Sequence, residues 1–411
     1  MKKTKLFLLS LLFIFIFGLS SWEFSLTEDV SSLVKGSTDE SSSESKESKS
    51  AGESSKESSS DEELKETSSE NKRSSENKTS SESKPHEESL ESTQSSSSDQ
   101  ESEGILSLLH DYKNDYVYQQ LGLDSTYGDL MQDAYDYYYD ACKEFLVSGS
   151  DLTPKVIGES SYNIVGAYPV NNQSDLYPLF STIAVFVQDN PLFYFLETGY
   201  SSYSSSSGSN ITYYACILCN DDYLSGSTRN ELNDVITTFI DDVNDNMTSV
   251  SNDEYHKIKA LHNYIIGRID YSYVTDSEGK TVPNNQAYAH NIIGVANAMG
   301  AVCEGYAKCY KLLCDLYDIN TIVVTGTAQT STSSGGHAWN YSMIDDTWYG
   351  VDVTWDDQRM KMNQDDYLLV SSSTMAQEHI PYDNKTYGLY YNVYLPTLSS
   401  SNYSYIGSVF S

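Results

Sequence analysis

Residues 300–308 read GAVCEGYAK, a stretch that places Cys303 directly after a glycine break. The apolar residues that follow recur at helical spacing and predict an amphipathic helix from Cys303 to about residue 317. A thiol at a helix N-terminus lies beside unpaired backbone N–H groups and the positive end of the helix dipole, and both favour the reactive thiolate. Cysteine is also a common small buried residue, so Cys303 alone does not indicate a catalytic role unless other catalytic residue types accompany it.

Two stretches downstream contain such partners. The first reads GGHAWN at residues 335–340, and the second reads YGVDVTWDD at residues 349–357. Both predict strands, and a two-residue turn at 345–346 would join them as a hairpin in which His337 pairs with Thr354. Asp352 then lies diagonally from His337 on the same face of the sheet, within reach of a side-chain hydrogen bond. A register offset of one residue would turn Asp352 to the other face, so this prediction depends on the turn.

Cys303, His337 and Asp352 therefore offer the nucleophile, the base and the orienting carboxylate of a Cys-His-Asp triad. The blocks that carry them are residues 302–308, 336–340 and 351–357. In order and spacing these blocks resemble the core of the transglutaminase-like superfamily, in its bacterial secreted branch. The resemblance covers approximately residues 250–372 of the chain.

The resemblance implies a papain-like α+β core in which a cysteine attacks a carboxamide, ammonia or an amine leaves, and an amine or water resolves the thioester. Carried over to this sequence, Cys303 is the nucleophile, His337 is the general base and then acid, and Asp352 fixes the imidazole tautomer. The family also includes peptidases and inactive members. Two alternatives therefore stay open: a cysteine peptidase or amidase with the same triad, and a non-catalytic cell-wall or adhesion module. We expect no cofactor and no metal.

The remaining patterns predict an α+β fold, with helices first and an antiparallel sheet afterwards. The predicted helices are 105–121, 130–146, 179–187, 227–245, 251–269, 292–299 and 303–317, and the predicted extended segments are 192–200, 211–218, 321–327, 336–344, 348–355, 367–370 and 389–394. A Ser- and Gly-rich loop at 201–209 indicates a hairpin with a long tip. Ser251 and Glu254 have the spacing of a helix capping box. We divide this part into an N-terminal α+β subdomain, 104–249, and a catalytic core, 250–411.

The N-terminal third predicts export rather than a folded domain. Three lysines precede an apolar run at residues 6–17, followed by small residues, which is typical of a secretory signal peptide at residues 1–21. The run is shorter than the about 20 apolar residues that a membrane helix needs, so membrane contact is expected only through an uncleaved signal segment. Residues 22–103 predict a disordered stalk, because 26 of the 67 residues from 37 to 103 are serine, interleaved with Glu and Lys. We expect a secreted, extracellular protein, and cell-surface association stays open.

The charge balance restricts the partners. The chain has 25 Lys and Arg against 59 Asp and Glu, a formal net charge of −34, which argues against nucleic-acid binding. Residues 104–411 carry 13 basic and 37 acidic groups, so most of the acidity belongs to the predicted folded part. An acidic surface attracts cationic partners by long-range steering. We expect a peptide or protein substrate. Whether that substrate is cationic or associated with the cell wall stays open, as does the oligomeric state.

The sequence does not favour a catalytic, metal-binding or redox role for the other five cysteines. Cys309 and Cys314 follow Cys303 on the same predicted helix and are interpreted as packing residues. Cys216 and Cys219 form a CxxC, but in a strand these positions point to opposite faces, so neither a metal nor a redox role is favoured. The disulfide state of Cys142, Cys216 and Cys219 stays open.

The remaining histidines and the 35 tyrosines are interpreted as structural. His110, His290 and His379 have no neighbouring Cys, Asp or Glu pattern, and we expect solvent-exposed or capping roles for them. Most tyrosines should pack in the core, since they recur on helix faces. The exceptions would be four tyrosines around the hairpin tip, which we expect to form an exposed aromatic surface: Tyr200, Tyr203, Tyr213 and Tyr214.

Overall fold

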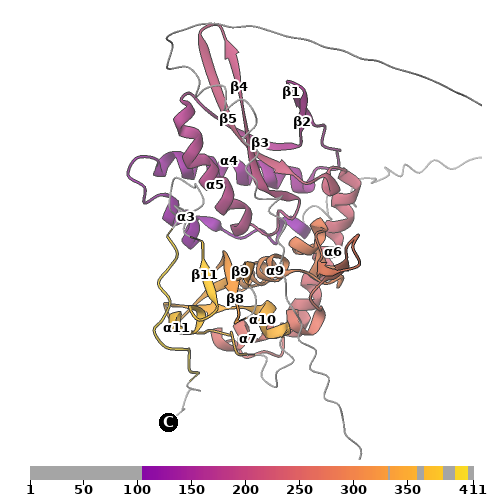
Figure 1. The fold of residues 1–411 in the computed structure, drawn as a ribbon, viewed down its shortest axis with the longest axis vertical. Coiled ribbons are helices and arrows are strands. Elements are labelled where there is room, and N and C mark those ends of the chain that lie inside the picture. Colours follow the sequence, from indigo (N-terminus) through magenta and orange to yellow (C-terminus); the bar gives the residue numbers. More distant parts are fainter. Residues whose placement is uncertain (1–103, 332–333, 359–364, 383–393, 406–411) are drawn as a thin grey trace, which may run out of the picture. The chain divides into compact units, whose positions relative to one another are not determined.

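The computed structural model describes residues 104–331, 334–358, 365–382 and 394–405 (Figure 1). The predicted signal peptide at 1–21, the predicted stalk at 22–103 and all but the last residue of the predicted segment 389–394 lie outside these residues. Within the described ranges, no helix combines the length and the apolar character needed to cross a membrane.

Helices and strands alternate in the first half of the described chain, and a sheet dominates the second, which confirms the α+β prediction. The helices are α3 (Tyr116–Leu121), α4 (Gly128–Val147), α5 (Leu176–Asp189), α6 (Gly226–Met247), α7 (Glu254–Arg268), α8 (Ile293–Ala296), α9 (Cys303–Asp315), α10 (Val353–Gln358) and α11 (Ser372–Met375), with short 3₁₀ helices that include η2 (Tyr112–Asn114). The strands are β1 (Lys155–Ile157), β2 (Ser160–Tyr162), β3 (Ile164–Val170), β4 (Leu196–Ser207), β5 (Asn210–Cys219), β6 (Tyr273–Thr275), β7 (Thr281–Pro283), β8 (Thr321–Gln329), β9 (Ser334–Ile344), β10 (Thr347–Val351) and β11 (His379–Pro381).

Two antiparallel sheets organise these elements. The first has the strand order β3-β5-β4, and α4 and α5 pack against it. The second has the order β10-β9-β8-β11, and α9 packs against β9 and β8 (Figure 1). One cluster of buried residues continues from α4 and α5 to α9, so the helix that begins at Cys303 is anchored in a large core. The predicted domain boundary at residue 249 stays a prediction.

Buried tyrosines form much of that core, as the sequence predicted. Tyr135 and Tyr138 on α4 are fully buried, and the Tyr135 ring packs edge-on against Phe186 at a centroid distance of 4.8 Å. The Tyr135 hydroxyl donates a hydrogen bond to Asp189 at 2.7 Å. An aromatic ring with a paired hydroxyl can replace Leu or Ile in a core without leaving a buried polar group unsatisfied.

The hairpin of β4 and β5 differs from the prediction. The long loop expected at 201–209 does not form, because the strands continue to a two-residue turn at 208–209. Gly208 there has φ +66°, the conformation that such a turn requires at its first position. The Tyr203 ring stacks on Tyr214 at 4.5 Å, and this cross-strand stacking supports the longer pairing. All four tyrosines of the expected aromatic surface are therefore half-buried rather than exposed.

Several predicted boundaries also needed correction. The helix expected at 105–121 is interrupted, because Asp115 is extended between η2 and α3. Asp253 caps α7 by accepting a hydrogen bond from the His256 backbone N–H at 3.1 Å, in place of the predicted Ser251. Helix α8 is shorter than predicted, 367–370 forms no strand, and β11 was not predicted.

A buried lysine ties α9 to the N-terminal helices. Lys311 is 1% exposed, and its Nζ lies 2.8 Å from Asp315, 3.5 Å from Asp189 and 3.6 Å from Asp115. Burial alone would lower the pKa of Lys311, but these three carboxylates raise it above its ordinary value. Asp115 precedes the tyrosine-rich helix α4 in sequence and Asp189 follows it. The ammonium therefore links segments that are far apart in the chain.

We therefore expect Lys311→Met to lower the free energy of unfolding by about 3–5 kcal/mol, because it leaves buried carboxylates without their counter-ion. The matched control is Lys113→Met, which removes an exposed lysine that lies 2.7 Å from Asp136 and should cost no more than about 1 kcal/mol. Urea denaturation measures both values. A Lys311→Met protein as stable as the control would contradict the anchoring role.

Candidate active site

The cysteine of the predicted triad begins α9, as the sequence predicted. Cys303 is 1% exposed and follows Val302, whose backbone is extended. Gly300 has φ +85°, a conformation that few other residues adopt, and this bend lets the chain turn into the helix. The Val302 N–H donates to the Ala289 carbonyl at 2.9 Å, which fixes the segment just before the thiol.

The glycine two residues later fixes the position of the first helical turn. A Cβ at Gly305 would lie 2.5 Å from the Ala289 carbonyl oxygen and 2.8 Å from the Ala301 Cβ. No side chain fits there, so the start of α9 packs backbone to backbone on the preceding segment. The thiol of Cys303 is therefore presented by a rigid turn rather than by a flexible loop.

The hairpin that carries the histidine has the predicted turn. Asp345 and Asp346 form it with φ of 49° and 56°, and Val351 pairs with Asn340 in the predicted register. Positive φ at both central positions matches the right-handed twist of the flanking strands.

The partner strand, however, ends earlier than predicted. β10 stops at Val351 and α10 starts at Val353, so the predicted pairing of His337 with Thr354 is wrong. The Asp352 Oδ1 accepts a hydrogen bond from the Trp355 backbone N–H at 3.0 Å, as a helix-capping carboxylate does. This capping bond starts a helix where the alternating pattern alone predicted a strand.

Asp352 still reaches His337 from this position. The His337 Nε2 donates to the Asp352 Oδ2 at 2.7 Å, and the two side chains are 2% and 1% exposed. Burial would lower the pKa of His337, but the charge and hydrogen bond of Asp352, together with a hydrogen bond to Cys303, raise it to about 10. Burial would raise the pKa of Asp352, and the charge of His337 outweighs it and holds that pKa below its usual range. The structure thus brings the three predicted residues together.

Comparisons with known proteins find similarity over part of this chain. Residues 241–353 match the family model of the transglutaminase-like superfamily. The chain carries a transglutaminase-like domain. Kyphoscoliosis peptidase from Mus musculus is 24% identical over 152 residues, 33% of this chain and 22% of that protein. The human protein is 21% identical over 166 residues, 36% of this chain and 24% of its own length. The chain therefore matches less than a quarter of the length of either relative.

Two solved structures are also similar to parts of the chain. One is described as a TGase, with 15% identity and a TM-score of 0.25 over 55% of this chain and 58% of that one. The other, from Cytophaga hutchinsonii, is provisionally described as a cysteine protease, with 16% identity and a TM-score of 0.23 over 39% of this chain and 63% of its own. At these scores neither structure informs the chemistry of the site.

A second histidine, which the sequence did not indicate, contacts Asp352 of the predicted triad. His379 begins β11 and pairs with Ala328 of β8. It is 2% exposed, and its Nε2 lies 2.8 Å from the Asp352 Oδ2, so the exposed or capping role expected for it is wrong. No local pattern marks this residue, because the strand pairing that places it joins segments about fifty residues apart.

The residue after the cysteine stabilises the same turn of the transglutaminase-like domain. Glu304 accepts from Lys308 at 2.9 Å and from His290 at 3.1 Å, so His290 is paired within the site. Burial would raise the pKa of Glu304, and Lys308 and His290 outweigh it and hold that pKa below the usual range. Glu304 is therefore a charged anchor beside Cys303.

The other five cysteines are buried and unbridged in the structure, as is Cys303. Burial raises the pKa of each of these five thiols, to about 12 for Cys216, Cys219 and Cys314. Such thiols are inert near neutral pH. The packing role predicted for Cys309 and Cys314 is confirmed, since both are fully buried.

Among the residues that the structure describes, two groups of side chains lie close enough together to hold a metal ion. They are His337, Asp352 and His379, and His110, Asp115 and Asp315. In each group an imidazole nitrogen already lies within hydrogen-bond distance of a carboxylate oxygen. These hydrogen bonds account for the clustering without an ion.

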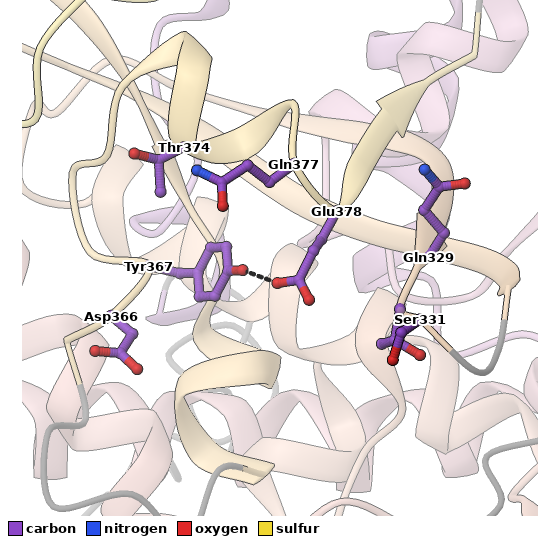
Figure 2. A pocket seen from close by; sticks show the side chains of 8 residues that line it. Gln329, Ser331, Asp366, Tyr367, Thr374, Gln377 and Glu378 are labelled. Atoms are coloured by element: carbon purple, nitrogen blue, oxygen red, sulfur yellow. Dashed lines mark hydrogen bonds between the residues drawn. The ribbon is translucent and has the colours of Figure 1, made fainter.

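A polar pocket of about 670 Å³ lies close to His379, and its lining includes Gln329, Tyr367 and Glu378. Figure 2 shows the Tyr367 hydroxyl donating to the Glu378 carboxylate across this pocket. The Tyr367 ring packs against His379 at a centroid distance of 5.2 Å. Cys303, His337 and Asp352 are not among the residues that line this pocket.

The pairing of His337 with Asp352 generates a titration prediction. In Asp352→Asn the carboxylate charge that favours the protonated imidazole is gone, while burial, which lowers the pKa, remains. We expect His337 to titrate near pH 10 in the wild type and at or below its ordinary value of 6.5 in the variant, measured by NMR of the imidazole.

The matched control is Asp356→Asn, because Asp356 is buried in α10, the helix that Asp352 caps, but accepts from His262 at 3.0 Å. This control should leave the titration of His337 close to that of the wild type. An unchanged pKa of His337 in Asp352→Asn would show that the contact at 2.7 Å does not control the imidazole.

Proposed function

We propose that this chain is an exported cysteine enzyme that transfers acyl groups from peptide or protein carboxamides through a thioester on Cys303. The observation that carries the proposal is the buried Nε2–Oδ2 hydrogen bond of 2.7 Å between His337 and Asp352. With Nε2 committed to Asp352, Nδ1 is the ring nitrogen left to face the thiol, which is the arrangement that activates a cysteine nucleophile.

In the first half-reaction the Cys303 thiol has given its proton to His337 Nδ1, and the thiolate sulfur forms a bond to the carboxamide carbon. His337 then returns that proton to the leaving nitrogen, the C–N bond breaks, and ammonia or an amine departs from a thioester. In the second half-reaction an amine or water gives its proton to His337 and attacks the thioester, and the thiolate leaves. A positioned base of this kind contributes about 10² to 10⁴ in rate.

Two features next to the thiol suit the negative oxygen that forms in each step. The first N–H groups of α9 have no partners within the helix and point toward its N-terminus. The Tyr271 hydroxyl is buried beside the Cys303 backbone, and no described residue accepts a hydrogen bond from it. A donor placed at such an oxygen is worth about 10²–10³ in rate.

Hydrolysis by the same triad is the second candidate. The two curated relatives are named peptidases, and in a peptidase or amidase water takes the place of the acceptor amine. The triad chemistry is common to both candidates, so the acceptor must be determined by experiment. The third candidate is a non-catalytic cell-wall or adhesion module, in which Cys303 would have no enhanced reactivity.

The sequence supports the proposed location and partners. The signal-peptide pattern at residues 1–21 favours action outside the cell. The charge of residues 104–411, 13 basic against 37 acidic groups, favours cationic protein or peptide partners and disfavours nucleic acid.

The direct test is incubation of the full chain with a glutamine peptide, with and without a primary amine. We expect incorporation of the amine, and loss of at least about 10³-fold in Cys303→Ala, because no other group can form the thioester. Cys309→Ala is the matched control, since Cys309 lies on the same helix but is fully buried and should leave the activity unchanged.

The products distinguish the candidates. Deamidation or cleavage without amine incorporation would support the hydrolase instead. If Cys303 reacted with iodoacetamide no faster than a free thiol, the enzymatic proposal would fail and the binding module would be favoured.

A further inference from the structure

The carboxylate of Asp352 accepts hydrogen bonds from two histidines on the same oxygen. The Asp352 Oδ2 lies 2.7 Å from the His337 Nε2 and 2.8 Å from the His379 Nε2. Its Oδ1 accepts from the Trp355 backbone N–H at 3.0 Å. A Cys-His-Asp triad requires only the first of these three bonds.

The surroundings of His379 assign its tautomer. Its Nδ1 is buried and has no hydrogen-bond partner among the described residues, whereas its Nε2 faces a carboxylate. A proton on Nδ1 would leave a buried donor unsatisfied and direct a lone pair at the carboxylate, which is unfavourable at both nitrogens. The proton therefore belongs on Nε2, and His379 donates to Asp352.

His379 is held rigidly in this position. Its ring packs against Trp355 at 4.5 Å and against Trp339 at 5.0 Å. The strand that carries it lies very close to β8, where a Cβ at Gly326 would come within 2.3 Å of the Ile380 carbonyl oxygen. Only a glycine at position 326 lets β11 approach closely enough for His379 to reach Asp352.

We propose that His379 is a positioning residue of the active site, which holds the Asp352 carboxylate and takes up part of its charge. The inference rests on the proposed function, because it concerns how Asp352 acts on the Cys303–His337 pair. A carboxylate oxygen that already accepts one hydrogen bond attracts a second donor less strongly. His379 therefore limits how strongly Asp352 stabilises the protonated form of His337.

This competition determines in which direction the pH dependence of the Cys303–His337 pair should change when His379 is removed. Without the His379 donor, Asp352 attracts the His337 proton more strongly, so the ion pair of a Cys303 thiolate with protonated His337 persists to higher pH. The acid limit of the pH window in which this ion pair exists is set by loss of the Cys303 thiol proton beside an imidazole that is already protonated, so this limit should not move to lower pH. A hydrogen bond to a charged group corresponds to about one to two pKa units, of which part reaches His337 through Asp352. We expect the alkaline limit of the window to rise by about half a unit to one unit.

Other titratable groups face the pair and must stay unchanged in the test. Tyr271 lies beside Cys303, Asp356 lies in α10 one turn after Asp352, and Tyr367 packs against His379. The Tyr367 hydroxyl is bonded to Glu378, the residue before His379. Each of these groups remains in place when only His379 is changed.

The test compares two substitutions at one position. His379→Phe keeps a ring in the aromatic surroundings but has no donor, whereas His379→Gln can place an amide N–H near the position of Nε2. The readout is the rate of Cys303 alkylation by iodoacetate across pH, because this anionic reagent prefers a thiolate paired with a protonated imidazole. The full chain is used, and labelling of Cys303 is followed by mass spectrometry.

We expect His379→Phe to extend the pH window on its alkaline side and His379→Gln to restore the wild-type window. The matched control is His262→Gln, which removes a buried histidine from Asp356 and should leave the window of Cys303 unchanged. An alkaline limit that is unchanged or lowered in His379→Phe would overturn the inference. If the wild-type window itself were absent, the proposed function would fail instead, so the two failures are distinguishable.

A second measurement applies if His379→Phe does not fold. Nitrogen-15 NMR of the wild-type imidazoles should show that both His337 and His379 carry a slowly exchanging proton on Nε2. A proton on Nδ1 of His379 would overturn the inference, because His379 could then not donate to Asp352.

Discussion

The burial of one carboxylate, that of Asp352, constrains much of the second sheet and its surroundings. A charge that is 1% exposed costs several kcal/mol in lost hydration unless donors replace the water. Three donors do so here, and they come from β9, from β11 and from the first turn of α10. The Asp352 backbone N–H also donates to the Tyr367 carbonyl at 3.0 Å. The stability of this region and the orientation of the imidazole therefore depend on the same side chain.

A second buried charge fixes the other half of the site. Lys311 lies on α9 and its ammonium contacts carboxylates from the N-terminal segments and from its own helix. Glu304 at the start of α9 is paired with His290 and Lys308. The helix that presents Cys303 is thus anchored by ion pairs at its first turn and further along, while Gly305 lets that turn lie directly on the neighbouring backbone. Such anchoring holds a nucleophile in one geometry without a conformational change.

Much of this arrangement was predictable from the sequence because its signals are local. The glycine break before Cys303 marks the start of α9, and the turn at 345–346 sets the register of β9 and β10. The end of β10 was not predictable from alternation, since the capping bond of Asp352 competes with strand pairing. His379 was missed for another reason: its strand is three residues long and is placed only by pairing with β8.

One thiol among six is singled out by its surroundings. Burial raises the pKa of the other five thiols, whereas Cys303 has beside it an imidazole that is itself held by a carboxylate. The most informative measurement is therefore a search for the covalent intermediate by intact-protein mass spectrometry, after acid quenching of the chain with a glutamine peptide. We predict an adduct of the peptide mass less one ammonia, located on Cys303 and absent from Cys303→Ala. An adduct that persists in Cys303→Ala, or turnover without any adduct on Cys303 in the wild type, would contradict the proposed role of this thiol.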